Sequence, residues 1–300
     1  MNTDLPPVSI VVPVYNGEAN IAACIESLLA LDYPEEKREI IIVDNNSRDR
    51  TPEIVEKYPV RLLKEKKQGA CCARNSGIRE ARFPLIAFTD SDCIAGKSWL
   101  KQMVACFQDE KTGGCGGRLE PVPPKTMIEE YTIYKDILSQ ERALQDEPIS
   151  PPFVITANAM FRKRVLEEAG GFDESFTIAG EDADLCWRIG WMGYRIGYAP
   201  LAVVKHNHRT TLRGLLRQIR SYGRGASQLF RKHHERLGYG GFFVSRPYRE
   251  ILFSIVKIPF ALVLGKDKFH RVLPILDFLG AISFLAGKLP ASLKYRIKYL

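Results

Sequence analysis

The fold of this chain is decided by the stretch LIAFTDSD at residues 85–92. Its apolar first half is typical of a strand that is buried on both faces of a parallel sheet. Asp90 and Asp92 follow where that strand ends, and open α/β sheets bind ligands at the carboxyl ends of their strands. If the chain stays extended, both carboxylates point the same way and can bind one Mg²⁺ or Mn²⁺ ion. The alternative to a metal site is a simple turn after the strand, because Asp and Ser are also common turn residues.

Strands and helices alternate over the first ~100 residues, which predicts a parallel sheet of the nucleotide-binding type. Strands are expected at 8–12, 39–43, 60–63 and 85–88, with Pro13 ending the first of them. Helices are expected from Ala19, from the segment around Pro52 and after Gly69. The sequence lacks both Gly-x-Gly-x-x-Gly after the first strand and Gly-x-x-x-x-Gly-Lys-Ser/Thr anywhere, which disfavours dinucleotide and P-loop folds.

The second part of the chain offers a candidate general base. A charged helix is expected from about 126 to 144 and a strand over 153–161. Glu181 and Asp182 then open a further helix. Acidic residues in a first turn are ordinary helix-start chemistry, but three carboxylates in four positions also suit a general base. His206, at the end of a predicted strand, is either structural or a metal ligand.

The charge is divided unevenly along the chain. Residues 203–300 carry 19 Lys/Arg against 4 Asp/Glu, a balance of +15, whereas residues 1–202 carry 24 against 31, or −7. Arginines 209, 213, 217, 220 and 224 recur at helical spacing. They form either a solvated face or one that binds phosphate or lipid headgroups.

Two apolar runs, 251–264 and 272–287, fall short of the ~20 residues that a spanning helix needs. With basic flanks, they suit helices that lie in a membrane interface, with packing on the catalytic domain as the alternative. We therefore expect a catalytic domain over 1–240, with a nucleotide-binding half at about 1–120 and an acceptor half at about 121–240. A basic, apolar, membrane-associating helical tail would follow over 241–300.

The seven cysteines include no Cys-x-x-Cys pair and sit mostly in apolar contexts. Reduced thiols in the core are the expected state, rather than a zinc site or a disulfide framework.

These motifs together resemble a family 2 glycosyltransferase of the GT-A fold. The matching segments occur in the family's order and span about residues 8–225: Pro13-Val14-Tyr15-Asn16, Val43–Thr51, Gly69–Gly77, Thr89-Asp90-Ser91-Asp92, Asn158, Phe161-Arg162, Gly171-Phe172-Asp173, Glu181-Asp182, His206 and Tyr222–Gly225. The resemblance implies an α/β fold with a mostly parallel central sheet. It also implies inverting transfer of one sugar from a nucleotide-diphosphate sugar to an acceptor hydroxyl, with Mn²⁺ or Mg²⁺.

The same resemblance assigns roles to individual residues. Asp182 would be the base, with Glu181 in reserve, and Asp92, Asp90 and His206 would hold the metal. The donor would be bound by Pro13, Tyr15, Asn16, Asp44, Asn45, Arg74, Asp90 and Ser91. Asn158, Phe172 and Asp173 would face the acceptor. The expected acceptor is a glycan or lipid-linked glycan, and the expected location is the cytoplasmic face of the cell membrane, against an anionic surface and without nucleic acid.

Two departures from the family pattern matter. Many members that use a uridine donor have a second Asp where this chain has Asn45, so the donor base stays open. The processive Gln-x-x-Arg-Trp motif is absent after residue 190, which disfavours a polysaccharide synthase. Two rivals remain: a sugar-1-phosphate nucleotidyltransferase, and a non-catalytic module that binds lipid or glycan.

Overall fold

The computed structural model describes residues 5–147, 150–177 and 179–299, and these form two compact units. The first unit contains the chain up to Val122, then Leu138–Thr177 and Glu181–Asn207. The second contains Pro123–Ile137, a short segment before Glu181, and the chain from His208 onward. The division near residue 240 that we expected from the sequence stays a prediction.

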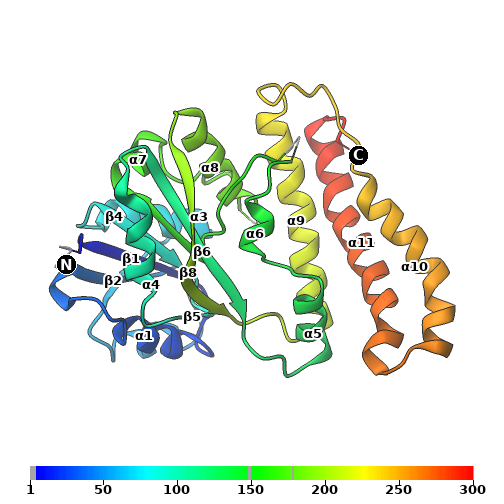
Figure 1. The fold of residues 1–300 in the computed structure, drawn as a ribbon, viewed down its shortest axis with the longest axis horizontal. Coiled ribbons are helices and arrows are strands. Elements are labelled where there is room, and N and C mark those ends of the chain that lie inside the picture. The colour runs from blue at the N-terminus through cyan, green and yellow to red at the C-terminus, as the bar shows by residue number, and fades with distance from the viewer. Residues whose placement is uncertain (1–4, 148–149, 178, 300) are drawn as a thin grey trace. The chain divides into compact units, whose positions relative to one another are not determined.

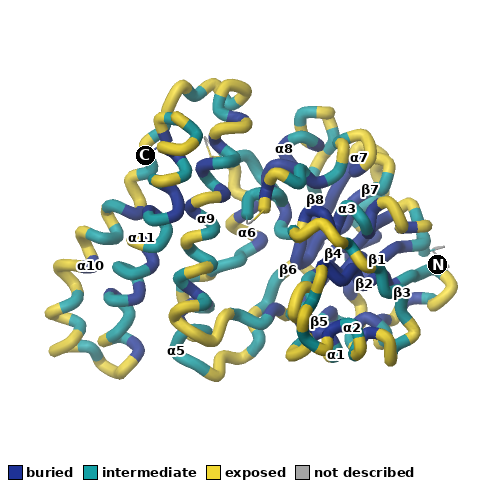
Figure 2. Tube along the Cα trace, turned by 180° about the vertical axis from the view of Figure 1, so that it is seen from behind, coloured by how far each residue is buried: buried dark blue, intermediate teal, exposed yellow. Residues whose placement is uncertain are grey.

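The first unit is built on one eight-stranded sheet with the order β3-β2-β1-β4-β7-β6-β8-β5. The first four strands in that order are parallel, as predicted, and β7 then joins β4 in the antiparallel sense. Figure 1 shows the sheet with helices around it, and Figure 2 shows that its strands are mostly buried. The strands are β1 (Val8–Val14), β2 (Arg38–Asp44), β3 (Arg61–Lys64), β4 (Leu85–Thr89), β5 (Cys93–Ala95), β6 (Thr112–Pro121), β7 (Asn158–Arg162) and β8 (Arg195–His206).

Helices cover both faces of the sheet because alternate residues of each buried strand point to opposite sides. On β1, the even-numbered residues 8–14 pack with Ile21 and Ile25 of α1 and with Trp99 of α4. The opposite face of β1 lies against α3, where Gly77 approaches Val11. The helices of this unit are α1 (Ile21–Leu29), α2 (Thr51–Val55), α3 (Ala70–Glu80), α4 (Trp99–Val104), α6 (Gln140–Ala143), α7 (Lys163–Glu168) and α8 (Glu181–Trp191), with 3₁₀ turns η1 (Glu35–Lys37) and η2 (Ala105–Gln108).

The first strand is longer than predicted, because Pro13 does not end it. Strand β1 continues to Val14, whose carbonyl accepts a bond from the backbone N–H of Asn45 on the β2 side. The backbone nitrogen of Pro13 therefore points toward β4, and the pairing between β1 and β4 has already ended at Val11. The missing N–H of proline removes no ladder bond at this position.

Two other boundary predictions were wrong. The helix expected over 126–144 is divided into α5 (Met127–Tyr134) and α6, because Asp136 and Leu138 take left-handed backbone conformations between them. The strand expected over 153–161 is confined to β7, and residues 153–157 form a loop before it.

The second unit is helical and consists of α5, α9 (Leu212–His233), α10 (Ser245–Leu264) and α11 (Lys268–Tyr295). Helix α9 begins after its cap Thr211, so Arg209 lies outside the helical row of arginines that we expected. The backbones of α9 and α11 approach closely at Gly223 and Gly287, where an added Cβ would meet a backbone carbonyl of the other helix. Glycines at these two positions therefore determine how tightly the two helices pack.

The apolar tail forms longer helices than the sequence suggested. Pro259, Pro274 and Pro290 lie inside helices and do not end them. Helix α11 has 28 residues and, by length and composition alone, could cross a membrane. The expectation that both runs are too short to span was therefore wrong for α11, although an apolar core helix would meet the same criteria.

The cysteine prediction holds for five of the seven residues. Cys24, Cys71, Cys72, Cys93 and Cys186 are free and buried. The structure joins Cys106 and Cys115, so the expectation of reduced thiols throughout was wrong for this pair.

Gly77→Ala should destabilise the first unit. The added methyl group would clash with the Val11 side chain, and overpacking of this kind costs about 1–3 kcal/mol. Gly190→Ala is the matched control, because Gly190 is also helical but has no atom within 4 Å of the added Cβ. Its unfolding free energy should stay the same or rise by up to about 1 kcal/mol. Equal denaturation midpoints for the two variants would contradict the close approach of α3 to β1.

Candidate active site

The loops after β1 and β2 are joined by hydrogen bonds at the carboxyl edge of the sheet. The backbone N–H of Asn16 donates to Ser47 Oγ at 2.9 Å, and that of Gly17 donates to Thr51 Oγ1 at 2.8 Å. Asn16 Oδ1 accepts from the backbone N–H of Arg48 at 2.8 Å. The joined loops leave the Tyr15 side chain 49% exposed, so its ring is accessible to a planar ligand.

Asp44 and Asn45 lie at the end of β2, and both are buried. The Asp44 carboxylate accepts from the backbone N–H of Ser47 at 3.2 Å. The Asn45 amide donates to the carbonyls of Glu65 and Lys67 at 2.9 and 2.7 Å. Its oxygen also accepts from the N–H of Gly69 at 2.6 Å. Asn45 thus shapes the segment that leads into α3, and its contact with a donor base stays a prediction.

Asp90 and Asp92 do not lie on an extended chain, as we had assumed. Strand β4 ends at Thr89, and residues 90–93 turn, with the N–H of Cys93 donating to the carbonyl of Asp90 at 3.1 Å. Ser91 lies in this turn, half-buried. The two carboxylates consequently have different partners, Arg74 for Asp90 and His206 for Asp92.

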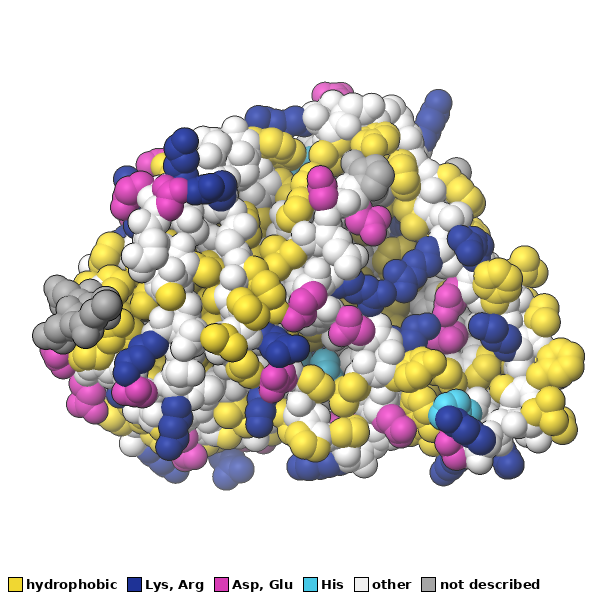
Figure 3. Space-filling model, in the orientation of Figure 1, with side chains coloured by type: hydrophobic (Ala, Val, Ile, Leu, Met, Phe, Trp, Pro, Cys, Tyr) yellow, Lys and Arg dark blue, Asp and Glu magenta, His cyan; other side chains and the backbone are white. Residues whose placement is uncertain are grey.

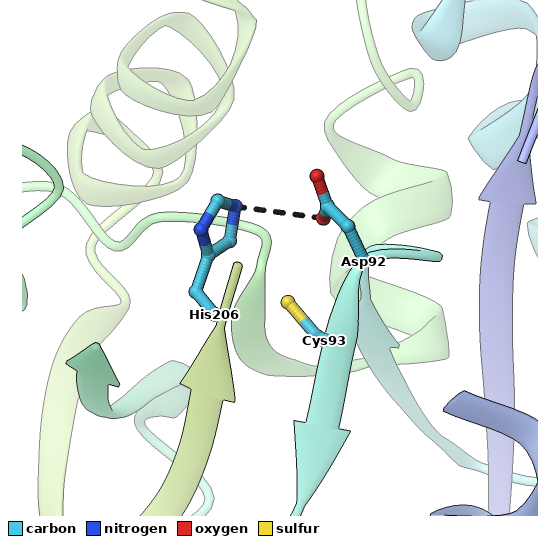
Figure 4. A group of neighbouring side chains, drawn as sticks. All are labelled: Asp92, Cys93 and His206. Carbon is cyan, nitrogen blue, oxygen red and sulfur yellow. Dashed lines mark ion pairs between the residues drawn. The ribbon is translucent and has the colours of Figure 1, made fainter. Parts of the chain in front are cut away.

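The Asp92 carboxylate and the His206 imidazole come together because β5 and β8 pair in the antiparallel sense, with Cys93 opposite His206. Asp92 Oδ1 lies 3.5 Å from His206 Nε2 (Figure 4). The ligand atoms of these two residues and of Cys93 all lie within 4.8 Å of one another. Carboxylate oxygen and imidazole nitrogen suit Mn²⁺, whereas burial raises the pKa of the Cys93 thiol well above its usual value. Asp92 and His206 therefore fit a hard divalent cation, and the Asp90 carboxylate is not a member of this group among the described residues.

Arg74 is a buried cation that joins the end of β4 to the start of α8. From α3, its guanidinium contacts Asp90 at 3.1 Å and Glu181 at 3.0 Å. The same guanidinium lies over the Phe172 ring, 5.5 Å from the centroid. Burial alone would lower the pKa of the Arg74 guanidinium. The surrounding carboxylates outweigh this effect and raise the pKa above its ordinary value, so Arg74 stays protonated. The guanidinium thus holds Asp90 and Glu181 in place.

Asp182 is hydrogen-bonded to Thr156, a residue that the sequence analysis did not single out. Thr156 Oγ1 donates to Asp182 Oδ1 at 2.9 Å, and its backbone N–H donates to Oδ2 at 3.2 Å. Burial, and secondarily the charge of Glu181, raise the pKa of Asp182 from its ordinary value of 3.8 to about 7. A carboxylate of this kind can take up a proton near neutral pH, as a general base must.

The three residues predicted to face the acceptor have distinct surroundings. Asn158 is completely buried, and its amide bonds to the carbonyls of Arg118 and Ala202 and to the indole N–H of Trp99, at 2.7–2.8 Å. Phe172 is buried edge-on against Phe88. The Asp173 side chain accepts from the N–H of Ser175 at 2.9 Å. Contact of these residues with an acceptor stays a prediction.

Comparison with known proteins identifies the class of this protein. The sequence profile described as glycosyl transferase family 2 matches residues 9–170. Glycosyltransferase AglE of Haloferax volcanii is 29% identical over an alignment of 238 residues that covers 77% of this chain and 76% of that protein. The pre-mycofactocin glycosyltransferase of Mycobacterium tuberculosis is 28% identical over 76% of this chain, but the match spans only 48% of that relative's length.

A solved structure with a similar fold is a mannosyltransferase from Pyrobaculum calidifontis, in complex with GDP-Man and Mn²⁺. Its TM-score is 0.66 at 22% identity, with 96% of this chain and 88% of that chain covered. This likeness shows the GT-A fold. The chain belongs to glycosyl transferase family 2, and the protein is a glycosyltransferase, as the sequence motifs predicted. Neither rival class is supported by these comparisons.

Proposed function

We propose that this glycosyltransferase moves one sugar from a nucleotide-diphosphate sugar to a hydroxyl of a glycan or lipid-linked glycan, with inversion at the anomeric carbon. The observation that carries this proposal is the Asp182 carboxylate, held by Thr156 and with its pKa raised to about 7. The mannosyltransferase of similar fold from Pyrobaculum calidifontis, in complex with GDP-Man, supports the class of donor, while the nucleobase and the sugar are open.

In the proposed reaction, Asp182 takes the proton of the acceptor hydroxyl while that oxygen attacks the anomeric carbon. The attack comes from the face opposite the leaving group, so the configuration inverts. A new carbon–oxygen bond forms to the acceptor, and the bond to the diphosphate breaks with its electron pair on the diphosphate. Arg74 holds Glu181 away from that role, because the Glu181 carboxylate is already paired with its guanidinium. Asp182 is therefore the preferred base of the two.

The charges at this edge of the sheet favour a divalent metal. Asp90, Asp92, Glu181 and Asp182 bring four carboxyl groups, against which Arg74 is the one cation that contacts Asp90 and Glu181 in the described structure. A donor diphosphate would add further negative charge to a region that is already acidic. Mn²⁺ or Mg²⁺ held by Asp92 and His206 would supply the positive charge that neutralises the diphosphate.

The proposed reaction can be tested by screening sugar nucleotides for release of nucleoside diphosphate. With the donor that this screen identifies, Asp182→Asn should lower the turnover rate by about 10²–10⁴-fold, because the amide cannot accept the proton. The donor KM should change little. A wild-type rate for Asp182→Asn, or a large loss of donor binding with turnover preserved, would place Asp182 outside the role of base.

The metal proposal is tested by following the same activity against Mn²⁺ concentration. Asp92→Asn should require at least about 10–100-fold more Mn²⁺ for half-maximal activity, because a neutral amide binds a hard cation weakly. Asp32→Asn is the control, since Asp32 is a surface residue paired with Lys101. If both variants show wild-type turnover at limiting Mn²⁺, Asp92 does not hold the metal.

We further propose that the second unit binds an anionic membrane surface, which would place the enzyme at the cytoplasmic face of the cell membrane. Helix α10 exposes a row of large apolar side chains, and Figure 3 shows hydrophobic side chains beside Lys and Arg at the right-hand edge, over α10. The exposed residues are Leu252, Phe253, Ile255, Val256, Phe260, Leu262, Val263 and Leu264. Exposed apolar surface next to basic residues is the combination that binds acidic lipid.

Flotation with liposomes tests the membrane proposal. The double variant Phe260→Asp, Val263→Asp places charge at positions that are 63% and 77% exposed. Its partition onto vesicles with acidic lipid should fall by at least about tenfold, since each buried apolar side chain contributes about 1.5–3 kcal/mol. Leu201→Asp is the control, because Leu201 is a 69% exposed residue of β8 in the first unit. Equal flotation of the two variants would exclude α10 as the membrane contact.

A further inference from the structure

We propose that Thr156 is the positioning residue for the Asp182 carboxylate during sugar transfer, an inference that rests on the proposed role of Asp182 as the base. Two independent donors of Thr156 reach the carboxylate, the hydroxyl at 2.9 Å and the backbone N–H at 3.2 Å, one on each oxygen. A carboxylate bound at both oxygens cannot rotate freely about its last bond. The orientation of its remaining lone pairs is thereby fixed before the acceptor arrives.

The segment that carries Thr156 is held in place by its own hydrogen bonds. The N–H of Val154 donates to Cys186 Sγ at 3.4 Å, and the N–H of Ile155 donates to Gln140 Oε1 at 3.0 Å. The next carbonyl, that of Ala157, accepts from Thr89 Oγ1 at 2.9 Å. Thr156 itself is buried. A fixed loop rather than a mobile one therefore presents both donors to Asp182.

The two hydrogen bonds also counteract the surroundings of the carboxylate. Burial and the neighbouring Glu181 favour the protonated form of Asp182, whereas Arg74 and the two bonds from Thr156 favour the charged form. Among the described residues, the buried thiols of Cys71 and Cys186 also interact electrostatically with Asp182, and burial keeps both thiols protonated. A base must be ionised before it can accept a proton, so the donors of Thr156 extend the pH range in which Asp182 can act.

Thr156→Val tests this role, because it removes the hydroxyl and keeps the backbone N–H and the branched shape. The full-length protein is assayed with the sugar nucleotide from the screen, and kcat is measured as a function of pH. The acid limb of this pH profile should move to higher pH by about one unit, because the lost hydrogen bond favoured the charged form of Asp182. The rate at neutral pH should fall by about tenfold, while the donor KM stays within about twofold. Thr156→Ser restores the hydroxyl and should return both the limb and the rate to near wild type.

Thr132→Val is the matched control. Thr132 is equally buried, but its hydroxyl donates to the carbonyl of Ile128 and not to a carboxylate. This variant can lower the melting temperature but should leave the acid limb where it is. If Thr156→Val does not fold, Thr156→Ala gives the same comparison, because alanine also lacks the hydroxyl and is smaller than threonine.

The outcomes separate this proposal from the proposed function. A wild-type rate for Asp182→Asn would overturn the role of Asp182 as base, whatever Thr156 does. If Asp182→Asn is inactive but Thr156→Val keeps the wild-type acid limb with only a lower melting temperature, Thr156 is structural and this inference is wrong. A Thr156→Ser variant that behaves like Thr156→Val would also overturn it, because the hydroxyl would then not be the group that matters.

Discussion

The site depends on one buried guanidinium. Arg74 reaches from α3 to the Asp90 carboxylate after β4 and to Glu181 at the start of α8, two places that are 91 residues apart in sequence. The guanidinium is shielded from water, with the Arg74 side chain only 6% exposed, whereas the Asp90 side chain is 32% exposed and that of Glu181 is 13% exposed. Loss of one partner from such a pair leaves an uncompensated charge in a region of low dielectric, which is far more costly than loss of a surface pair. The position of α8 against the sheet edge is therefore tied to Arg74.

This arrangement leaves an excess of negative charge. One guanidinium lies among three carboxyl groups, those of Asp90, Glu181 and Asp182, and all three act on its protonation. Arg74 is paired directly with two of them, while burial, and secondarily the charge of Glu181, raise the pKa of the third, Asp182. Burial and the neighbouring Glu181 carboxylate thus raise the proton affinity of Asp182, as the role of general base that we propose for it requires.

Several residues of the family motifs support the fold around the site. Asn45 bonds to the segment that leads into α3, and Asn158 connects β6, β8 and α4 through its buried amide. Gly77 lets α3 approach β1, and Gly223 lets α9 approach α11. In each case a small or amide side chain occupies a position where a larger or apolar one would leave backbone groups unpaired or overlap a neighbour.

The sequence by itself determined the parallel half of the sheet, since apolar runs of strand length alternate with amphipathic helices in the first hundred residues. It also determined that candidate site residues lie at the strand ends, because Asp44, Asp90 and His206 each lie at or just after the end of a strand. These features are local, and they depend on hydrophobic periodicity and on turn residues. The same local rules placed the start of α3 after Gly69 and of α8 at Glu181.

Only the tertiary structure decided which of these residues meet. The turn at 90–93 sends Asp90 toward Arg74 and Asp92 toward His206, whereas an extended chain would have pointed both the same way. Pro13 could remain within β1 because β4 stops pairing at Val11, a fact about a neighbouring strand that no local pattern contains. Thr156 was missed for the same reason: a threonine in an apolar segment has no distinguishing mark until the fold brings Asp182, 26 residues away, to its hydroxyl. Partners that are distant in sequence are chosen by packing and by the need to satisfy buried charges, and both arise only when the chain is folded.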